Sequence, residues 1–410
     1  MKLHRLIQQF ERPRVGHVAR TVQSHLAGCG VQIPRGPSIA IAAGSRGIAN
    51  LAQITKSVVA FVQSAGANPF IIPAMGSHGG ATAQGQAAVL ASYGITEKTM
   101  GCPIRSSMEV VPLDADGLET KLFMDRFAWE SDGVILINRI KLHTDFHGRF
   151  ESGLVKMCVI GLGKEKQAHE MHRFGVHGLR DLVPEAAKCI LSSGKILFGI
   201  AIIENACDET AQIEAIPAKS IFTREPELLD IARGNMPRLP VDELDVLVID
   251  RLGKNISGSG IDTNIIGRIR IAGEPEPESP RIRSILVTDL TPETHGNACG
   301  LGLADVITQR LRDKIDFGVT YTNIITSGFL ERGKMPVVGA TDRDAFEIGL
   351  RGAGCRDPQK ARIIRILDTL HLGELLVSGP VLEELRGRAK IEAHGPPVPL
   401  FDSNGQLRPF

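Results

Sequence analysis

The segment SIAIAAGSRGIANLAQITKSVVAFVQSAGANPFIIPAMGSHGG spans residues 38–80 and contains two successive units of the kind that builds a parallel sheet. Residues 38–43 and 70–75 are apolar runs of strand length, and each ends in a glycine-rich turn. A helical pattern follows each turn, over residues 48–65 and 81–92. Two consecutive strand–loop–helix units predict parallel strands whose following loops lie at the same edge of the sheet.

The two loops after these strands carry the first candidate site residues, Arg46 and His78. We expect them to be neighbours at the edge where α/β sheets bind ligands. The Arg46 guanidinium offers a rigid fork for a carboxylate or hydroxyl group of a substrate, although it can equally bridge to a surface acid. His78 lies between glycines and can carry protons near neutral pH, unless it caps the following helix.

The alternation of strands and helices continues along the chain and predicts two α/β domains with largely parallel sheets and an active-site cleft between them. The N-terminal domain is expected over residues 1–235 and the C-terminal domain over residues 236–410. Residues 216–240, rich in Pro, Arg and Glu, are expected to connect them. In the second domain, helices are expected over residues 302–313 and 360–369.

Residues 138–177 hold five of the twelve histidines and follow a β-branched run that is expected to be a strand. His143 and His147 lie on the loop after this strand, where either can act in proton transfer. His169 and His172 share one face of the helix expected next. His172 is a candidate metal ligand because neutral imidazole is the commonest protein ligand, although one histidine does not make a metal site.

Lys156 lies between these histidines in the apolar segment GLVKMC at residues 153–158. An ammonium group is costly to bury unless it is paired, deprotonated or covalently modified. Lys156 is therefore a candidate covalent anchor or nucleophile. The alternative is a structural lysine whose stem lies on apolar surface while its amine reaches water.

The composition of the 410 residues narrows the class of partner. A hydrophobic content of 43% and a formal net charge of +1, with dispersed basic residues, predict a globular protein that binds a small molecule rather than nucleic acid or an acidic membrane. No apolar run is long enough to span a bilayer. The seven cysteines are odd in number and contain no CxxC pair, so we expect a reducing, cytoplasmic environment.

The order and spacing of these residues resemble those of the nickel-pincer-nucleotide enzymes, that is, the lactate racemase family and its homologues that act on other 2-hydroxy acids. Members carry an arginine after the first strand, a Gly-x-His after the second, and a histidine before a glycine-rich segment that ends in lysine. A further histidine follows sixteen residues later. The matching residues here are Arg46, His78, His143, Lys156 and His172.

The resemblance implies a nickel-pincer nucleotide, a pyridinium mononucleotide with two sulfur-containing arms that is tethered to Lys156 and carries nickel held by His172. It also implies an isomerase, a racemase or epimerase that oxidises a 2-hydroxy acid reversibly. His78 and His143 would act as acid and base, and Arg46 would orient the substrate. The implied partners are the hydroxy acid and the enzymes that build the cofactor.

The sequence departs from the lactate enzymes in both halves. Ala43 replaces an aspartate three residues before the arginine. A second-domain motif begins here at Asp262, and Gly267 and Arg270 replace its glutamine and lysine. We therefore expect a longer, polar or dicarboxylic 2-hydroxy acid rather than lactate, with Arg270 among the residues that bind it.

Some alternatives stay open at this stage. Extra residues between His143 and Lys156 leave His147 as a competitor for the role of His143. A histidine-metal hydrolase or lyase, in which Lys156 is structural, and a nucleotide-binding homologue without catalytic activity are the two other functions compatible with the pattern. The stereochemistry and the oligomeric state have no signature in the sequence.

Overall fold

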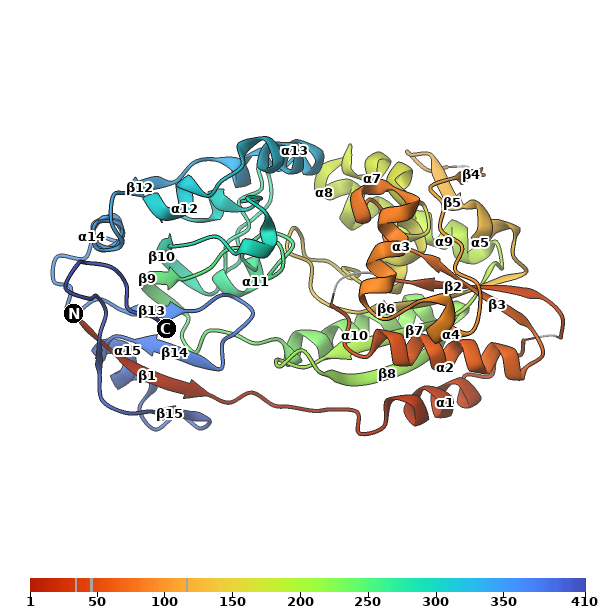
Figure 1. Ribbon diagram of the computed structural model, residues 1–410, viewed down its shortest axis with the longest axis horizontal. Coiled ribbons are helices and arrows are strands. Elements are labelled where there is room, and N and C mark those ends of the chain that lie inside the picture. Colours follow the sequence, from red (N-terminus) through yellow and green to blue (C-terminus); the bar gives the residue numbers. More distant parts are fainter. Residues whose placement is uncertain (34, 45–46, 116) are drawn as a thin grey trace. The chain divides into compact units, whose positions relative to one another are not determined.

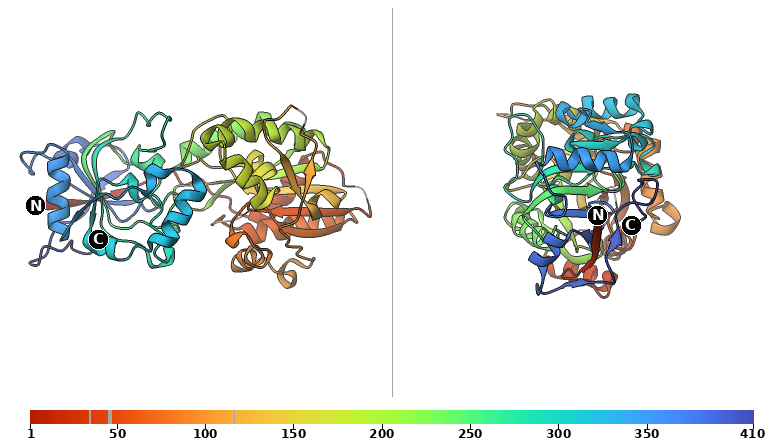
Figure 2. Two further views of the ribbon diagram at one scale, coloured as in Figure 1. Left: turned by 90° about the horizontal axis from the view of Figure 1, so that it is seen from above. Right: turned by 90° about the vertical axis from the view of Figure 1, so that its left-hand side faces the viewer.

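The computed structural model describes residues 1–33, 35–44, 47–115 and 117–410. These residues form two compact units (Figure 1). The N-terminal unit is Glu11–Met236, and the C-terminal unit is Met1–Phe10 together with Pro237–Phe410. Both chain ends belong to the C-terminal unit (Figure 2). Each unit is a sheet with helices packed on it, which confirms the predicted α/β class with largely parallel sheets.

The sheet of the N-terminal unit consists of β2 (Ser38–Ala43), β3 (Asn68–Pro73), β6 (Gly133–Arg139), β7 (Ile196–Glu204) and β8 (Thr210–Pro217), in the spatial order β3-β2-β6-β7-β8. Neighbouring strands are parallel except β7 and β8, which form an antiparallel hairpin. Ile39 and Ile41 point into a core shared with α1 (Val18–Gly28) and α2 (Leu51–Ser64). Ala40 and Ala42 point to the opposite face, which is equally buried, as expected of a parallel strand.

A topological switch point lies between β2 and β6, because the chain runs from β2 outward to β3 and then returns to the other side of β2. Open α/β sheets bind ligands at such points, beyond the carboxyl ends of the strands. Gly44 follows β2 and packs against the end of β6 so closely that a Cβ atom would lie 2.7 Å from Asn138 Oδ1. The histidine-rich stretch leaves β6 at this edge.

The face of the sheet opposite α1 and α2 carries α6 (Leu154–Lys156), which continues directly into a π-helical turn, Met157–Gly161. Leu154 reaches the sheet where β7 has Gly199, and a Cβ at that position would lie 2.6 Å from Leu154 Cδ1. The close approach therefore requires a glycine. The unit also contains the antiparallel pair β4 (Val110–Leu113) and β5 (Leu122–Asp125), and the helices α3 (Ala83–Ser92), α4 (Glu97–Met100), α5 (Arg126–Glu130), α7 (Lys164–His172), α8 (Gly175–His177), α9 (Val183–Ser192) and α10 (Ile221–Asn235).

The sheet of the C-terminal unit follows the path β12-β11-β10-β9-β13-β14-β1-β15, and β16 also pairs with β1. The strands from β12 to β13 are parallel, whereas β14, β1, β15 and β16 join antiparallel. The strands are β1 (Lys2–Gln8), β9 (Glu243–Ile249), β10 (Arg281–Val287), β11 (Val306–Thr308), β12 (Val337–Gly339), β13 (Ile363–Ile366), β14 (Glu374–Val377), β15 (Ile391–Ala393) and β16 (Val398–Pro399). The helices are α11 (Thr263–Ile266), α12 (Gln309–Asp313), α13 (Phe317–Ser327), α14 (Asp342–Gly352) and α15 (Gly379–Leu385).

Residues 1–10 belong to the C-terminal unit, whereas the domain bounds expected from the sequence placed them in the N-terminal domain. β1 pairs with β14, with His4 opposite Val377, so the first strand belongs to the unit formed by the second half of the chain. Among the described residues, no helix is long and apolar enough to cross a membrane.

Two expectations about secondary structure are wrong. Residues 360–369 contain the central strand β13 rather than a helix, because β9 and β14 pair with it on either side and bury all its residues. Residues 302–313 contain β11 and only a short helix, α12. Residues 216–240 do contain the boundary between the two units, at Met236 and Pro237, and most of this segment forms the helix α10, which buries Leu228 and Leu229.

Candidate functional site

The loop that follows β6 is closed at its base by two backbone hydrogen bonds. The N–H of Lys141 donates to the carbonyl of Ser152 at 2.9 Å, and the N–H of Ser152 donates back at 3.1 Å. We call residues 141–152 the histidine loop, because His143 and His147 both lie on it. The loop starts at the switch-point edge of the sheet and ends at the start of α6.

The His143 ring is held on three sides within the histidine loop and α6. It stacks on Phe146 with 4.6 Å between ring centroids, and its Nδ1 accepts the backbone N–H of Asp145 at 3.1 Å. Its Nε2 contacts the Nζ atom of Lys156. Burial lowers the pKa of His143 well below 6.5, and the nearby charge of Lys156 lowers it further. The ring is therefore neutral, and its contact with Nζ places Lys156 beside a neutral imidazole.

Lys156 is presented by α6, whose first turn is anchored by a buried acid far along the chain. Oε2 of Glu225 accepts the backbone N–H groups of Leu154 at 2.8 Å and Val155 at 3.0 Å. The preceding residue, Gly153, has no side chain, and a Cβ there would lie 2.3 Å from Glu225 Oε1. Burial raises the pKa of Glu225 to about 7. The helix turn that positions Lys156 thus depends on a side chain from α10.

His172 is the last residue of α7 and lies near the same lysine. Burial lowers the pKa of His172 to about 4, with a smaller contribution from the charge of Lys156. Its Nδ1 is buried and has no hydrogen-bond partner among the described residues. Because Lys156 influences both rings, His143, Lys156 and His172 converge on one site, with both imidazoles neutral.

The turn that carries His78 packs against the π-helical turn that follows Lys156. The side-chain amide of Gln86 donates to the carbonyls of Gly76 at 2.8 Å and His78 at 3.3 Å. Gly76 has φ +60, and a Cβ there would lie 3.2 Å from Ile160 Cγ2. This packing brings the loop after β3 to the helix turns around Lys156. Arg46 lies outside the described residues, so its expected place beside His78 stays a prediction.

A buried ion pair supports this arrangement and was not expected from the sequence. Lys164 starts α7, is fully buried, and lies 3.0 Å from the equally buried Asp125 carboxylate. Its Nζ also contacts the carbonyl oxygen of Pro73, at the end of β3. Burial lowers the pKa of Lys164, and the Asp125 charge partly offsets this. The pair ties β3, β5 and α7 together beneath the site.

The other three histidines of this stretch, at positions 147, 169 and 177, are exposed. His169 lies on the surface of α7. The His147 side chain is 41% exposed, and its Nδ1 lies 3.3 Å from the buried carboxylate of Glu151. Glu151 was not singled out in the sequence, since nothing local distinguishes a buried acid from one on the surface.

In the C-terminal unit, the guanidinium of Arg270 is engaged by its own surroundings. It donates to Asp305 at 2.6 Å and to the carbonyl of Gly302 at 2.7 Å. Gly267 ends α11 with φ +61, and a Cβ there would lie 2.0 Å from the carbonyl oxygen of Pro280. Position 267 therefore contributes no side chain, and the role of Arg270 in binding substrate stays a prediction.

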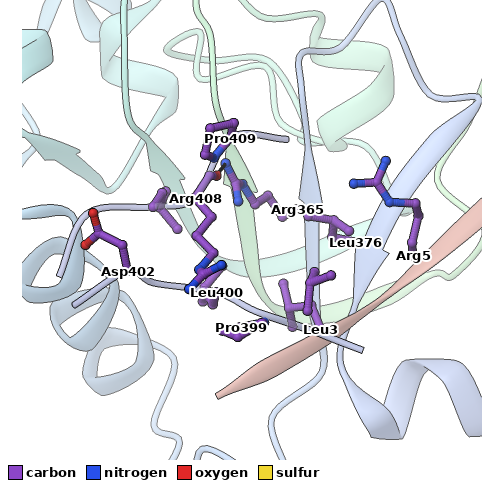
Figure 3. Close-up of a pocket in the computed structure, with 11 residues that line it drawn as sticks. Leu3, Arg5, Arg365, Leu376, Pro399, Leu400, Asp402, Arg408 and Pro409 are labelled. Atoms are coloured by element: carbon purple, nitrogen blue, oxygen red, sulfur yellow. Dashed lines mark hydrogen bonds between the residues drawn. The ribbon is translucent and has the colours of Figure 1, made fainter. Parts of the chain in front are cut away.

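A separate hollow of about 450 Å³ lies in the C-terminal unit, where the C-terminal tail, residues 398–409, crosses β1, β13 and β14 (Figure 3). Leu3 and Leu400 line it, and Arg365 donates a hydrogen bond to the carbonyl of Arg408 at 2.7 Å. Arg365 is bound to Asp250 through two hydrogen bonds of 2.7 Å. Because the buried Arg365 is already paired with Asp250, we interpret this hollow as the packing boundary between the tail and the sheet.

A comparison with solved structures finds the lactate racemase apoprotein from Thermoanaerobacterium thermosaccharolyticum, with a TM-score of 0.51 and 12% sequence identity. The match covers 89% of this chain and 94% of that chain. The fold is lactate racemase-like. A scan with protein-family models finds none that matches, and a search of curated proteins likewise finds no match.

The residues gathered in this lactate racemase-like fold fit the implied cofactor. The neutral His172 ring, with a buried nitrogen that lacks a hydrogen-bond partner in the described structure, has the protonation state of a metal ligand. Nζ of Lys156 contacts a neutral imidazole, so a primary amine that can form a covalent bond lies in the site. Both groups lie at the carboxyl-end edge of the sheet or on the helices packed there, which is where an α/β fold binds a nucleotide.

Proposed function

We propose that this chain is an isomerase that racemises or epimerises a 2-hydroxy acid by means of a nickel-pincer nucleotide attached to Lys156. The observation that carries the proposal is the convergence of Lys156 with two neutral histidines, His143 and His172, at the ligand-binding edge of a lactate racemase-like fold. A cytoplasmic location fits the seven cysteines, all of which lie within the described residues as free thiols.

Each residue has a distinct role in this proposal. Lys156 supplies the amine that holds the cofactor, and His172 supplies a neutral nitrogen for nickel. The bound cofactor would supply a reversible hydride acceptor, which would let the C2–H bond of a hydroxy acid break without leaving an unstabilised carbanion. His143 and His78, from loops that follow β6 and β3, take and return the hydroxyl proton, one for each stereoisomer.

Attachment at Lys156 changes the charge around His143. Burial is the main cause of the low pKa of His143, and the positive charge of Lys156 is the second. An acylated lysine carries no charge, so attachment removes the second-largest of the effects that lower the pKa. Removal of this charge acts to raise the pKa of His143, the direction that favours proton exchange near neutral pH.

The substrate that we infer is a 2-hydroxy acid longer or more polar than lactate. The support is the loss of a side chain at Gly267, where the backbone of Pro280 leaves no room for one. Arg270 would contribute only if a substrate carboxylate replaced Asp305 as its partner. Assays on lactate, malate, 2-hydroxyglutarate and aldonates test this directly: activity on lactate alone would contradict the inferred substrate class.

The hydrolase or lyase alternative has less support. A catalytic zinc site needs about three protein ligands. Among the described residues, no three His, Cys, Asp or Glu side chains are grouped to hold a metal. A cofactor that brings its own donors needs only one histidine from the protein, and His172 meets that requirement.

The test is production of the protein together with cofactor-building enzymes, followed by intact mass and nickel analysis. We expect an adduct of mononucleotide size on the peptide that contains Lys156, with nickel near one per chain. Lys156→Arg should abolish the adduct, because a guanidinium is not acylated. Lys166→Arg is the matched control, since Lys166 stacks on Phe123 in a contact that arginine preserves. An unmodified Lys156, with a working control enzyme in the same cells, would overturn the proposal.

A further inference from the structure

Glu151 contacts both histidines of the histidine loop with one buried carboxylate. Its side chain is 0% exposed. Oε2 accepts the backbone N–H of His143 at 2.6 Å. Oε1 lies 3.3 Å from His147 Nδ1 and 3.4 Å from the backbone nitrogen of Gly148. The Glu151 side chain therefore lies inside the histidine loop, where Oε2 binds the backbone of His143 and Oε1 lies close to the His147 ring.

The carboxylate decides which nitrogen of His147 carries hydrogen. An ionised carboxylate only accepts hydrogen bonds, so the ring nitrogen that faces it must be the donor. His147 is therefore held as the Nδ1–H tautomer when it is neutral, and the lone pair is on Nε2. Because the ring is 41% exposed, this basic nitrogen belongs to a side chain that solutes can reach.

We infer that Glu151 is the positioning residue of the histidine loop. One oxygen fixes the backbone that places the His143 ring against Lys156, and the other sets His147 as a second proton acceptor on the same loop. The importance of this arrangement for catalysis rests on the proposed function, whereas the hydrogen bonds themselves can be tested without it.

Other charged groups around the carboxylate allow a different role. The Arg233 guanidinium on α10 lies 3.6 Å from Oε1, and the Arg180 side chain packs against Gly148. Lys141 and Asp145 belong to the loop itself. If Glu151 served only to pair with Arg233, its replacement would loosen the loop without selecting a tautomer of His147.

The variant Glu151→Gln separates the two roles, because an amide offers one acceptor and one donor where the carboxylate offers two acceptors. The backbone N–H groups of His143 and Gly148 can both only donate, but the His143 contact at 2.6 Å is far shorter than the Gly148 contact at 3.4 Å, so the carbonyl oxygen should stay with His143. The amide NH₂ group then faces His147 Nδ1, which must accept. The His147 ring should therefore switch from the Nδ1–H to the Nε2–H tautomer.

The measurement is the ¹⁵N chemical shift of the histidine ring nitrogens in the full chain labelled with ¹⁵N-histidine and made without cofactor, with His147→Gln to assign the signals. Hydrogen exchange of the His143 amide is the second readout. We expect Glu151→Gln to exchange the shifts of the two His147 nitrogens and to keep the His143 amide protected. Glu151→Ala should lose that protection by about tenfold, as for one lost hydrogen bond.

A second histidine–carboxylate pair of the same spacing provides the control. His177 Nδ1 lies 3.0 Å from Asp181 at the surface, so Asp181→Asn should change the signals of His177 and leave those of His147 unaltered. An unchanged His147 tautomer in Glu151→Gln would overturn the inference, whatever the Ala variant does. Failure of the proposed function would appear separately, as an absent adduct on Lys156.

Discussion

Replacing Glu225 by glutamine tests whether the helix turn that carries Lys156 is anchored by a carboxyl group that is neutral when folded. Burial raises the pKa of Glu225 from 4.5 to about 7, although its hydrogen bonds from Val155 and Leu154 act in the opposite direction. In Glu225→Gln the amide oxygen can keep both hydrogen bonds, and the group no longer ionises. The helix turn should therefore retain its geometry while its dependence on pH disappears.

The direction and size of the effect follow from linkage. A carboxyl group with a raised pKa binds its proton more tightly in the folded protein, so the unfolded chain ionises first as the pH rises above 4.5. Wild-type stability then falls until about pH 7 and stays constant above it, whereas the full contribution is present below pH 4.5. The interval from 4.5 to about 7, at about 1.4 kcal/mol per pH unit, corresponds to about 3 kcal/mol. Glu225→Gln should gain most of this relative to wild type between pH 5 and pH 8.

Urea unfolding followed by tryptophan fluorescence measures this change in the N-terminal unit. Trp129 is the single tryptophan of the chain and lies on α5 of the N-terminal unit, so its signal reports the unit that contains Glu225. Glu185→Gln, at an exposed position of the same unit, controls for the loss of one carboxyl group. If the free energy of unfolding of Glu225→Gln differed from wild type by the same amount at pH 5 and pH 8, the reasoning would be refuted.

Three further variants test other parts of the site. Lys164→Met leaves a buried carboxylate without its ion-pair partner and should lower the free energy of unfolding by about 3–5 kcal/mol in the same fluorescence assay. His172→Ala should lower the nickel content of co-expressed protein several-fold while the mass adduct on Lys156 remains, and equal nickel in both proteins would remove His172 from the metal site. Gly199→Val forces a side chain into Leu154 and should cost about 1–3 kcal/mol, which a simultaneous Leu154→Ala change should partly restore.

The strands around the site could be predicted because their signals are local. β2, β3 and β6 are apolar runs that end at glycine or polar residues, and a parallel strand buried on both faces has few other possible structures. β13 could not be recognised in this way. Its neighbours β9 and β14 are distant in the sequence, and pairing with them decides the structure of a short segment whose own pattern also suits a helix.

The residues of the candidate site also divide into those that the sequence could predict and those that it could not. His143, Lys156 and His172 were singled out by residue type and spacing. Glu225 lies 71 residues from Leu154 along the chain, so no local pattern connects them. Gly153 was a possible signal, since it is the position where a side chain would collide with Glu225.

The position of β1 has a consequence for the order in which the chain is completed. β1 lies between β14 and β15. The pairing of His4 with Val377 joins two residues that are far apart in the sequence. At a synthesis rate of about 10 residues per second, β1 therefore stays without its neighbouring strands for on the order of half a minute after it is made. Lys2 and Arg5 put charges on this waiting strand, which disfavours pairing with other nascent chains. Truncating the first ten residues would remove an inner strand of the finished sheet, so the C-terminal unit should tolerate such a truncation far less well than its place in the sequence suggests.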